Sequence, residues 1–179
     1  MTLKLSVVAL ALAGLIGCAN NRAPDVAGKV RDSLKQAGLN SVTVSQDRDK
    51  GVVTLGGNVA QAEQKSQAEQ IAQPLVGGQV VANEIAVLPK GDSAARTVDS
   101  DLDKGIEANL DAALAQSNIK GVRHSTKNGV VTLKGELATP QMRADIERMA
   151  TGVPNVQQVV NEIDVKNQRA TSSSADRSR

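Results

Sequence analysis

Two side chains with distinctive chemistry occur once each in this sequence: the thiol of Cys18 and the imidazole of His124. A single cysteine excludes a disulfide within the chain, and one cysteine with one histidine excludes a Cys/His metal cluster within one chain. His124 has no Ser, Cys or acid at the spacing of a catalytic motif, so we expect it to pack in the core. The pair Gly56-Gly57 lacks the Lys and Ser/Thr of a phosphate-binding loop. The thiol of Cys18 is therefore the best candidate for a reactive group.

Cys18 ends a segment, residues 1–17, with the features of a secretory signal peptide. Lys4 supplies the positive charge, and an apolar run from Leu5 to Leu15 is too short to span a bilayer as a permanent helix. The run ends at Leu15-Ile16-Gly17-Cys18, which resembles a bacterial lipobox. That resemblance implies cleavage between Gly17 and Cys18 and a diacylglyceryl group on the thiol. A plain signal peptide that happens to include a cysteine is the alternative.

The lipobox resemblance also implies where the mature protein resides. Several acyl chains, palmitate among them, would hold the chain firmly, since each buried methylene contributes about 0.8 kcal/mol. Cys18 is followed by Ala19 and not by Asp, which usually retains lipoproteins of diderm bacteria in the inner membrane. We therefore expect a lipid-anchored protein on the periplasmic side of the outer membrane.

Two motifs recur at a constant offset of seventy-eight positions, so the chain contains an internal duplication. Gly51-Val52-Val53-Thr54-Leu55 returns as Gly129-Val130-Val131-Thr132-Leu133, and Val81-Ala82-Asn83-Glu84-Ile85 returns as Val159-Val160-Asn161-Glu162-Ile163. Since both motifs keep one offset, no gap is needed between them. We place the copies at residues 25–88 and 101–166, behind a tether at 18–24.

The composition limits what these two copies can bind. The sequence has no Phe, Tyr or Trp, so it lacks the usual anchors for nucleic-acid stacking and for membrane interfaces. Residues 25–88 hold six Lys/Arg and seven Asp/Glu, and residues 101–165 hold seven and nine. Neither copy is basic, so nucleic acid is not an expected partner.

Hydrophobic periodicity gives both copies the same element order. In the first, Pro24-Asp25 opens a helix with an apolar stripe, two alternating segments form a hairpin around residues 47–50, residues 60–75 form a helix, and residues 81–87 form a third strand. Pairing Ile119 with Leu39 requires an offset of eighty, so the first hairpin turn should be two residues longer. The fold class is α+β, with two αββαβ domains, each a three-stranded mixed sheet packed on two helices.

The second copy adds specific signals. Its first stripe is Leu102, Ile106, Leu110, Ala113 and Leu114, Asn128-Gly129 marks a hairpin turn, and Thr139-Pro140 caps and starts the second helix. The buried face of that helix is predicted as Met142, Ile146, Met149, Ala150 and Val153. Residues 89–100 read as a linker, and the Ser-rich residues 167–179 read as a disordered tail.

Polar residues on the predicted strands have two interpretations. Asn83 and Asn161 face inward and could contact a ligand, but we favour buried amides that bond to loop backbone and fix the strand register. Glu84 and Glu162 lie on the opposite face and are expected to be solvated. Because the helices cover only one side of each sheet, the open faces are expected to contact each other or a partner. They carry Val52, Thr54, Val80 and Ala82 in the first copy, and Arg123, Val130, Lys134, Val160 and Glu162 in the second.

The two motifs, with their order and spacing, resemble those of the BON domain family across about 130 residues. A lipobox followed by two such domains is similar to outer-membrane lipoproteins that maintain envelope integrity, in which the first helix of the second copy can dock on anionic phospholipid. Here that helix is acidic, with Asp101, Asp103, Glu107 and Asp111 against Lys104, and should be repelled by anionic lipid. A basic surface for phospholipid would instead include Arg123, Lys127 and Lys134.

We therefore expect a non-enzymatic, lipid-anchored periplasmic binding protein without a cofactor or metal, supporting outer-membrane and envelope integrity, with phospholipid contact as one route. The alternative is a protein-only adaptor whose domains dock on envelope machinery and do not touch lipid.

Overall fold

The structure is a computed structural model that describes residues 22–88, 93–165 and 171–174. The first domain contains α1 (Ala27–Gln36), β1 (Val42–Asp47), β2 (Val52–Val59), α2 (Ala62–Ala72), the short 3-10 helix η1 (Gln73–Leu75), β3 (Val80–Asn83) and β4 (Ala86–Val87). The second contains α3 (Ser93–Gln116), β5 (Val122–Lys127), β6 (Val130–Gly135), α4 (Pro140–Thr151), β7 (Gln158–Asn161) and β8 (Thr171–Ser174). The αββαβ order predicted for each copy is confirmed.

Each domain has a mixed sheet with its hairpin on one side and its parallel strand on the other. The central strands β2 and β6 pair antiparallel with β1 and β5, and parallel with β3 and β7. The pair Asp47↔Val52 leaves four residues in the first hairpin turn, 48–51, whereas Lys127↔Val130 leaves two, 128–129. The longer first turn is therefore confirmed. Asn128 and Gly129 both have positive φ, as their turn type requires.

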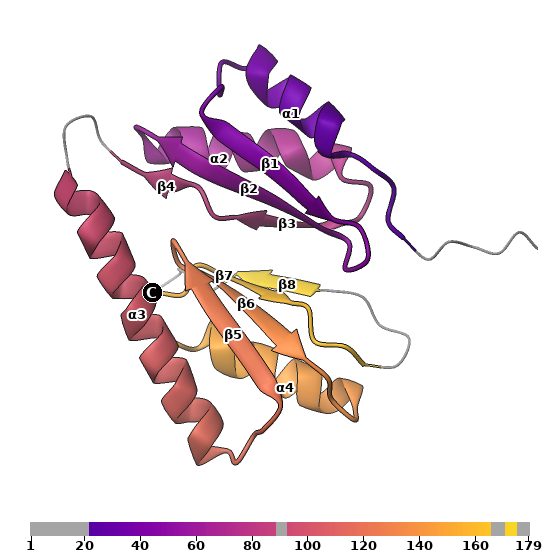
Figure 1. Cartoon of the computed structure of the whole chain (residues 1–179), viewed down its shortest axis with the longest axis vertical. Helices are drawn as coiled ribbons and strands as arrows, with labels where there is room; N and C mark the ends of the chain where they lie inside the picture. Colours follow the sequence, from indigo (N-terminus) through magenta and orange to yellow (C-terminus); the bar gives the residue numbers. More distant parts are fainter. Residues whose placement is uncertain (1–21, 89–92, 166–170, 175–179) are drawn as a thin grey trace, which may run out of the picture.

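Two separate aliphatic cores stabilise the domains. The first core joins Val30 and Leu34 of α1 to Val53 and Leu55 of β2. The second joins Ile106 and Leu110 of α3 to Val131 and Leu133 of β6. In Figure 1, α1 and α2 lie on the outer side of the first sheet, α4 lies on the outer side of the second, and α3 runs along one side of the molecule.

Two helices begin at residues other than those predicted. α1 begins at Ala27, because the side chain of Gln46 in β1 accepts the first backbone N–H groups, from Val26 and Ala27. α3 begins at Ser93, so residues 93–100 of the predicted linker are helical. Leu102, predicted as part of the apolar stripe of this helix, is 43% exposed.

The buried face of α4 also differs from the prediction. Thr139 caps this helix and Pro140 starts it, as expected, but Met142 is 41% exposed and Arg143 is buried instead. Arg143 takes this place because its guanidinium donates to the carbonyl of Asn161, at 2.8 Å. Burial lowers the pKa of Arg143, while the nearby carboxylates of Glu147 and Asp164 act in the opposite direction.

The prediction of disorder throughout residues 167–179 is wrong for Thr171–Ser174. These residues form β8, which pairs antiparallel with β7 and gives the second sheet a fourth strand. The edge of β7 presents unpaired N–H and C=O groups, which any extended segment can satisfy whatever its side chains. The composition of the tail therefore does not predict this strand.

Candidate functional site

The open faces of the two sheets pack against each other, which confirms the prediction that these faces form a contact. Val52 and Ala82 of the first domain and Val130 and Val160 of the second form a buried cluster, with Val80 partly buried against it. We call these five residues the junction cluster. Val160 is 0% exposed, and each of the other three buried members is at most 3% exposed. The two domains therefore form a continuous structure with the helices outside and the sheets inside (Figure 1).

Side-chain amides connect the domains beside the junction cluster. The carboxamide of Gln158 in β7 donates to the carbonyl of Val81, at 2.6 Å, and accepts from the backbone N–H of Asn83, at 3.1 Å. A donor and an acceptor from one amide thus satisfy the edge of β3 much as a neighbouring strand would. Asn128 in the second hairpin turn donates to the carbonyl of Glu84, at 2.7 Å. These contacts fix the two sheets in one relative position.

Ion pairs also bridge the junction. Lys50 Nζ contacts both carboxylate oxygens of Asp164, at 2.6 and 2.7 Å, and Lys127 Nζ lies 3.0 Å from Glu84 Oε2. The prediction that Glu84 and Glu162 are solvated is wrong, since their side chains are 17% and 9% exposed. They lie on the open faces, as expected, but the opposite domain covers those faces and shields the two side chains from solvent.

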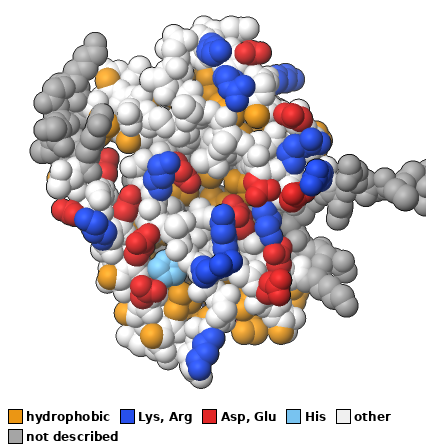
Figure 2. Space-filling view, in the orientation of Figure 1, with side chains coloured by type: hydrophobic (Ala, Val, Ile, Leu, Met, Phe, Trp, Pro, Cys, Tyr) orange, Lys and Arg blue, Asp and Glu red, His pale blue; other side chains and the backbone are white. Residues whose placement is uncertain are grey.

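Two of the three residues predicted to contact phospholipid have an acidic partner. Lys127 pairs with Glu84, and Lys134 Nζ lies 3.3 Å from Glu162 Oε2. Arg123 is exposed and lies opposite Lys134 in the β5–β6 pairing. A hollow of about 580 Å³ beside them is lined by the bases Lys50, Arg123 and Lys134 and by the acids Glu136, Glu162 and Asp164. Figure 2 shows basic and acidic side chains interspersed on this face.

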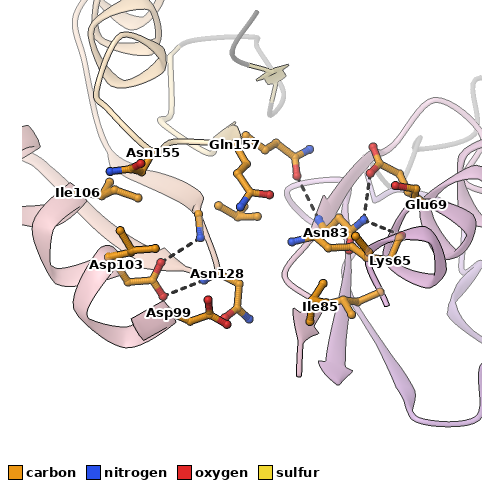
Figure 3. Close-up of a pocket in the computed structure, with 17 residues that line it drawn as sticks. Lys65, Glu69, Asn83, Ile85, Asp99, Asp103, Ile106, Asn128, Asn155 and Gln157 are labelled. Atoms are coloured by element: carbon orange, nitrogen blue, oxygen red, sulfur yellow. Dashed lines mark hydrogen bonds between the residues drawn. The ribbon is translucent and has the colours of Figure 1, made fainter. Parts of the chain in front are cut away.

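A larger cleft of about 750 Å³ opens between the domains at the other end of the junction. Its walls come from α2, the segment from β3 to β4, the start of α3, the β5–β6 turn and the loop before β7. Its lining includes the side chains of Lys65, Glu69, Asn83, Ile85, Asp99, Leu102, Asp103 and Gln158. Figure 3 shows residues of both domains facing each other across this space. We call it the interdomain cleft.

The paired asparagines are buried amides with local partners, as favoured. Asn161 is 0% exposed; its amide donates to the carbonyl of Arg143 and to Glu147 Oε2, and its Oδ1 accepts from the N–H of Ile163. Asn83 donates to the equivalent positions in α2, Lys65 and Glu69. Most of these partners belong to helices and not to loops, so each asparagine fastens its third strand to its second helix.

We expect Asn161→Ala to cost more stability than Asn83→Ala. The first substitution removes all three bonds and leaves the buried N–H of Ile163 without its acceptor, at a cost of about 2–3 kcal/mol. The second removes donors only, and about 1 kcal/mol is expected. Urea unfolding measures the loss of unfolding free energy in each variant. The two substitutions are matched controls for each other, because Asn83 and Asn161 occupy equivalent positions in the two domains. Equal losses would show that the Ile163 bond contributes nothing.

His124 packs beside α3, consistent with the predicted structural role. Its side chain is 9% exposed, and Nε2 lies 2.8 Å from Asp111 Oδ1. Met149 is partly buried against the second core. Within residues 22–88, 93–165 and 171–174, no group of three or more Asp, Glu, His or Cys is placed to hold a metal ion, and no helix combines the length and apolar character needed to cross a membrane. Gly17 and Cys18 lie outside the described residues.

Sequence reasoning found the junction cluster but missed the polar contacts around it. Lys50 and Asp164 are 114 positions apart, and Gln158 precedes the strand motif by one residue. Hydrophobic alternation marks which residues face outward, but it carries no signal about which outward residues meet across domains.

The family model of the BON domain matches residues 23–89 and 102–167, and the chain therefore belongs to the BON domain family. Proteins with this domain are known in association with the bacterial envelope. No curated protein sequence matches the chain.

Two solved structures of CdsD, a structural protein of the type III secretion system of Chlamydia trachomatis, are similar to this chain at 13% sequence identity. The match to the structure of its C-terminal domain covers 78% of the present chain and 96% of the CdsD chain, with a TM-score of 0.33. The match to the second structure covers 76% of the present chain and 90% of the CdsD chain, with a TM-score of 0.35. These likenesses are too distant to carry an argument about function.

Proposed function

We propose that this chain is a lipid-anchored binding protein on the periplasmic side of the outer membrane, and that its two BON domains support envelope integrity by docking on envelope proteins. The acyl chains on Cys18 hold it to the membrane. The domains act as one body with a defined surface, without a catalytic role. This proposal rests on the lipobox resemblance for the anchor and on the charges of the junction for the docking.

The ion pairs of the basic side chains favour a protein partner over phospholipid. Attraction to an anionic membrane contributes about 1 kcal/mol for each Lys or Arg near the surface, so a docking face needs several uncompensated cations. Lys127 and Lys134 lie beside Glu84 and Glu162, and Lys50 beside Asp164. The face retains little net positive charge, and contact between the domains and phospholipid is the weaker of the two functions.

Vesicle flotation tests this proposal. The chain from Ala19 to Arg179, which lacks the cysteine, is expected to stay at the bottom of the gradient with zwitterionic and with anionic vesicles, at low and at physiological salt. The acylated chain that begins at Cys18 is the positive control and should float with both. Flotation that needs anionic lipid and weakens with salt would contradict the proposal in favour of phospholipid binding.

A variant pair identifies the surface in that contrary case. Lys127→Ala with Lys134→Ala removes cations beside the junction, whereas Lys29→Ala with Lys120→Ala removes two cations elsewhere. Loss of flotation in the first pair alone would place phospholipid on the predicted basic residues. Equal loss in both pairs would indicate non-specific attraction.

A further inference from the structure

Asn128 and Gly129 form the single Asn-Gly dipeptide of the sequence and make up the β5–β6 turn. Glycine has no side chain to shield its backbone nitrogen, so this nitrogen can attack the amide carbon of the asparagine before it. A bond forms between Gly129 N and Asn128 Cγ, the bond from Cγ to Nδ2 breaks, and Nδ2 leaves as ammonia with the proton of Gly129. Water then opens the cyclic imide to aspartate or isoaspartate. The turn therefore holds the reacting groups for deamidation, with water as the co-reactant.

The folded structure binds both reacting groups of this dipeptide. The nucleophile, the backbone N–H of Gly129, donates to Asp103 Oδ1 at 2.9 Å, and the N–H of Asn128 donates to Asp103 Oδ2 at 2.8 Å. Figure 3 shows these two bonds, which join the turn to α3. The leaving group, Asn128 Nδ2, donates to the carbonyl of Glu84 at 2.7 Å. Ring closure requires the N–H to leave Asp103 and the amide to leave Glu84, so both contacts should slow it.

One of these restraints exists only while the domains are docked. Asp103 belongs to the same domain as the turn, whereas Glu84 belongs to the first domain. The duplication places Lys50 at the position equivalent to Asn128, and Lys50 also crosses the junction, to Asp164. Each hairpin turn thus contacts the other domain through the residue before its glycine. Opening of the junction frees the Asn128 amide and should therefore accelerate deamidation.

Deamidation should in turn weaken docking. An aspartate at position 128 has no N–H to donate to the carbonyl of Glu84, and it adds a negative charge to the turn that the carboxylate of Asp103 already binds. Two acceptors that face each other repel. Isoaspartate inserts a methylene group into the backbone of a two-residue turn in which both residues have positive φ. Either product removes one of the contacts that fix the two sheets.

We propose that Asn128-Gly129 is a deamidation site controlled by domain docking, in which the docked arrangement suppresses the reaction and the product favours the open junction. The substrate is the chain's own amide. A transient opening of the junction becomes lasting once the amide is lost, because docking again does not restore the nitrogen. The modification thereby records how long the domains have been apart.

Peptide mapping by mass spectrometry measures the reaction in the chain from Ala19 to Arg179, which keeps every residue that the structure describes. At mildly alkaline pH, position 128 should convert about tenfold or more slowly in the folded chain than in the same chain unfolded in guanidinium chloride. Val52→Asp places a carboxylate in the junction cluster and should raise the folded rate about threefold or more. Because Val52 belongs to the first domain, local damage there leaves the turn of the second domain intact.

Exposed positions on α3 provide the controls for this rate. Val98→Asp, at a residue that is 56% exposed, should leave the rate unchanged. Asp103→Ala frees the nucleophile and should raise it, whereas Asp101→Ala, at a residue paired with Lys104, should not. Equal rates in the folded and unfolded chains, or in Val52→Asp and the unsubstituted chain, would overturn the proposal.

Hydrogen exchange tests the effect of the product on docking. The N–H of Asn83 donates across the junction to Gln158 Oε1, whereas the N–H of Glu84 donates within the first domain, to the carbonyl of Leu55. These neighbouring amides therefore report separately on the junction and on the first sheet. Asn128→Asp should accelerate exchange at Asn83 about threefold to tenfold and leave exchange at Glu84 unchanged.

Asn118→Asp is the charge-matched control for this substitution. Asn118 also has a positive φ, and it is exposed beyond the end of α3. Its substitution should leave both amides unchanged. Unchanged exchange at Asn83 in Asn128→Asp would contradict an effect on docking. Faster exchange at both amides would also contradict it, since the substitution would then destabilise the first domain as a whole.

Discussion

Val160→Asp is expected to separate the two domains while leaving each of them folded. Val160 is completely buried in the junction cluster, among Val52, Ala82 and Val130. The substitution removes about 1.5–3 kcal/mol of apolar burial and places a carboxylate where no basic side chain of the cluster can pair with it. Undocking exposes that carboxylate to water at a lower cost than keeping it buried.

Small-angle scattering and circular dichroism measure the two parts of this result. The radius of gyration should rise, and the helix and strand signals should remain. Val98→Asp is the matched control, because Val98 is 56% exposed on α3, and it should change neither quantity. If Val160→Asp kept the wild-type radius, the junction cluster would not hold the domains together.

Gly57→Ala and Gly135→Ala are expected to be the most damaging of the glycine substitutions, each costing about 2–4 kcal/mol. The two glycines are equivalent in the duplication and have φ of +93° and +149°, a region that alanine avoids. An added Cβ would also overlap a backbone carbonyl, that of Ser41 in the first domain and that of Gly121 in the second. Neither carbonyl can rotate away as a side chain could.

Two helical glycines provide controls with the opposite sign. A Cβ at Gly28 in α1 or at Gly105 in α3 would meet no atom within 4 Å apart from its chain neighbours and the nearby backbone of its own helix. Gly28→Ala and Gly105→Ala should therefore stabilise the protein by about 0.5–1 kcal/mol each, through helix propensity. Urea unfolding measures all four variants. Equal effects at the strand and helix positions would show that the carbonyl contacts do not matter.

The duplication made most of the fold predictable. A motif that appears twice aligns the two copies, so that the alternation in one supports the strands of the other, and the offset change from seventy-eight to eighty located the longer hairpin turn between Asp47 and Val52. The alternation around Val130 and Val160 also showed which faces are open. Burying those faces follows from the same rule that buries the cores, since exposed valines on two neighbouring sheets gain by contact.

The candidate site was less predictable because it depends on pairs that are distant in sequence. The contact between Lys50 and Asp164 requires knowledge of how the sheets face each other. Arg143 was missed for a similar reason, because its burial is stabilised by the carbonyl of Asn161 and not by its own hydrophobicity. The strand β8 was missed because a free sheet edge accepts residues of low strand propensity.

The junction cluster and the interdomain cleft exist only if the two domains form one rigid body. Residual dipolar couplings of backbone amides in the chain from Ala19 to Arg179 measure this. We predict that one alignment tensor fits the amides of β1–β3 and of β5–β7 together, in the orientation of Figure 1. Two tensors of different magnitude would mean that the domains reorient independently, and would contradict both the junction and the site built on it.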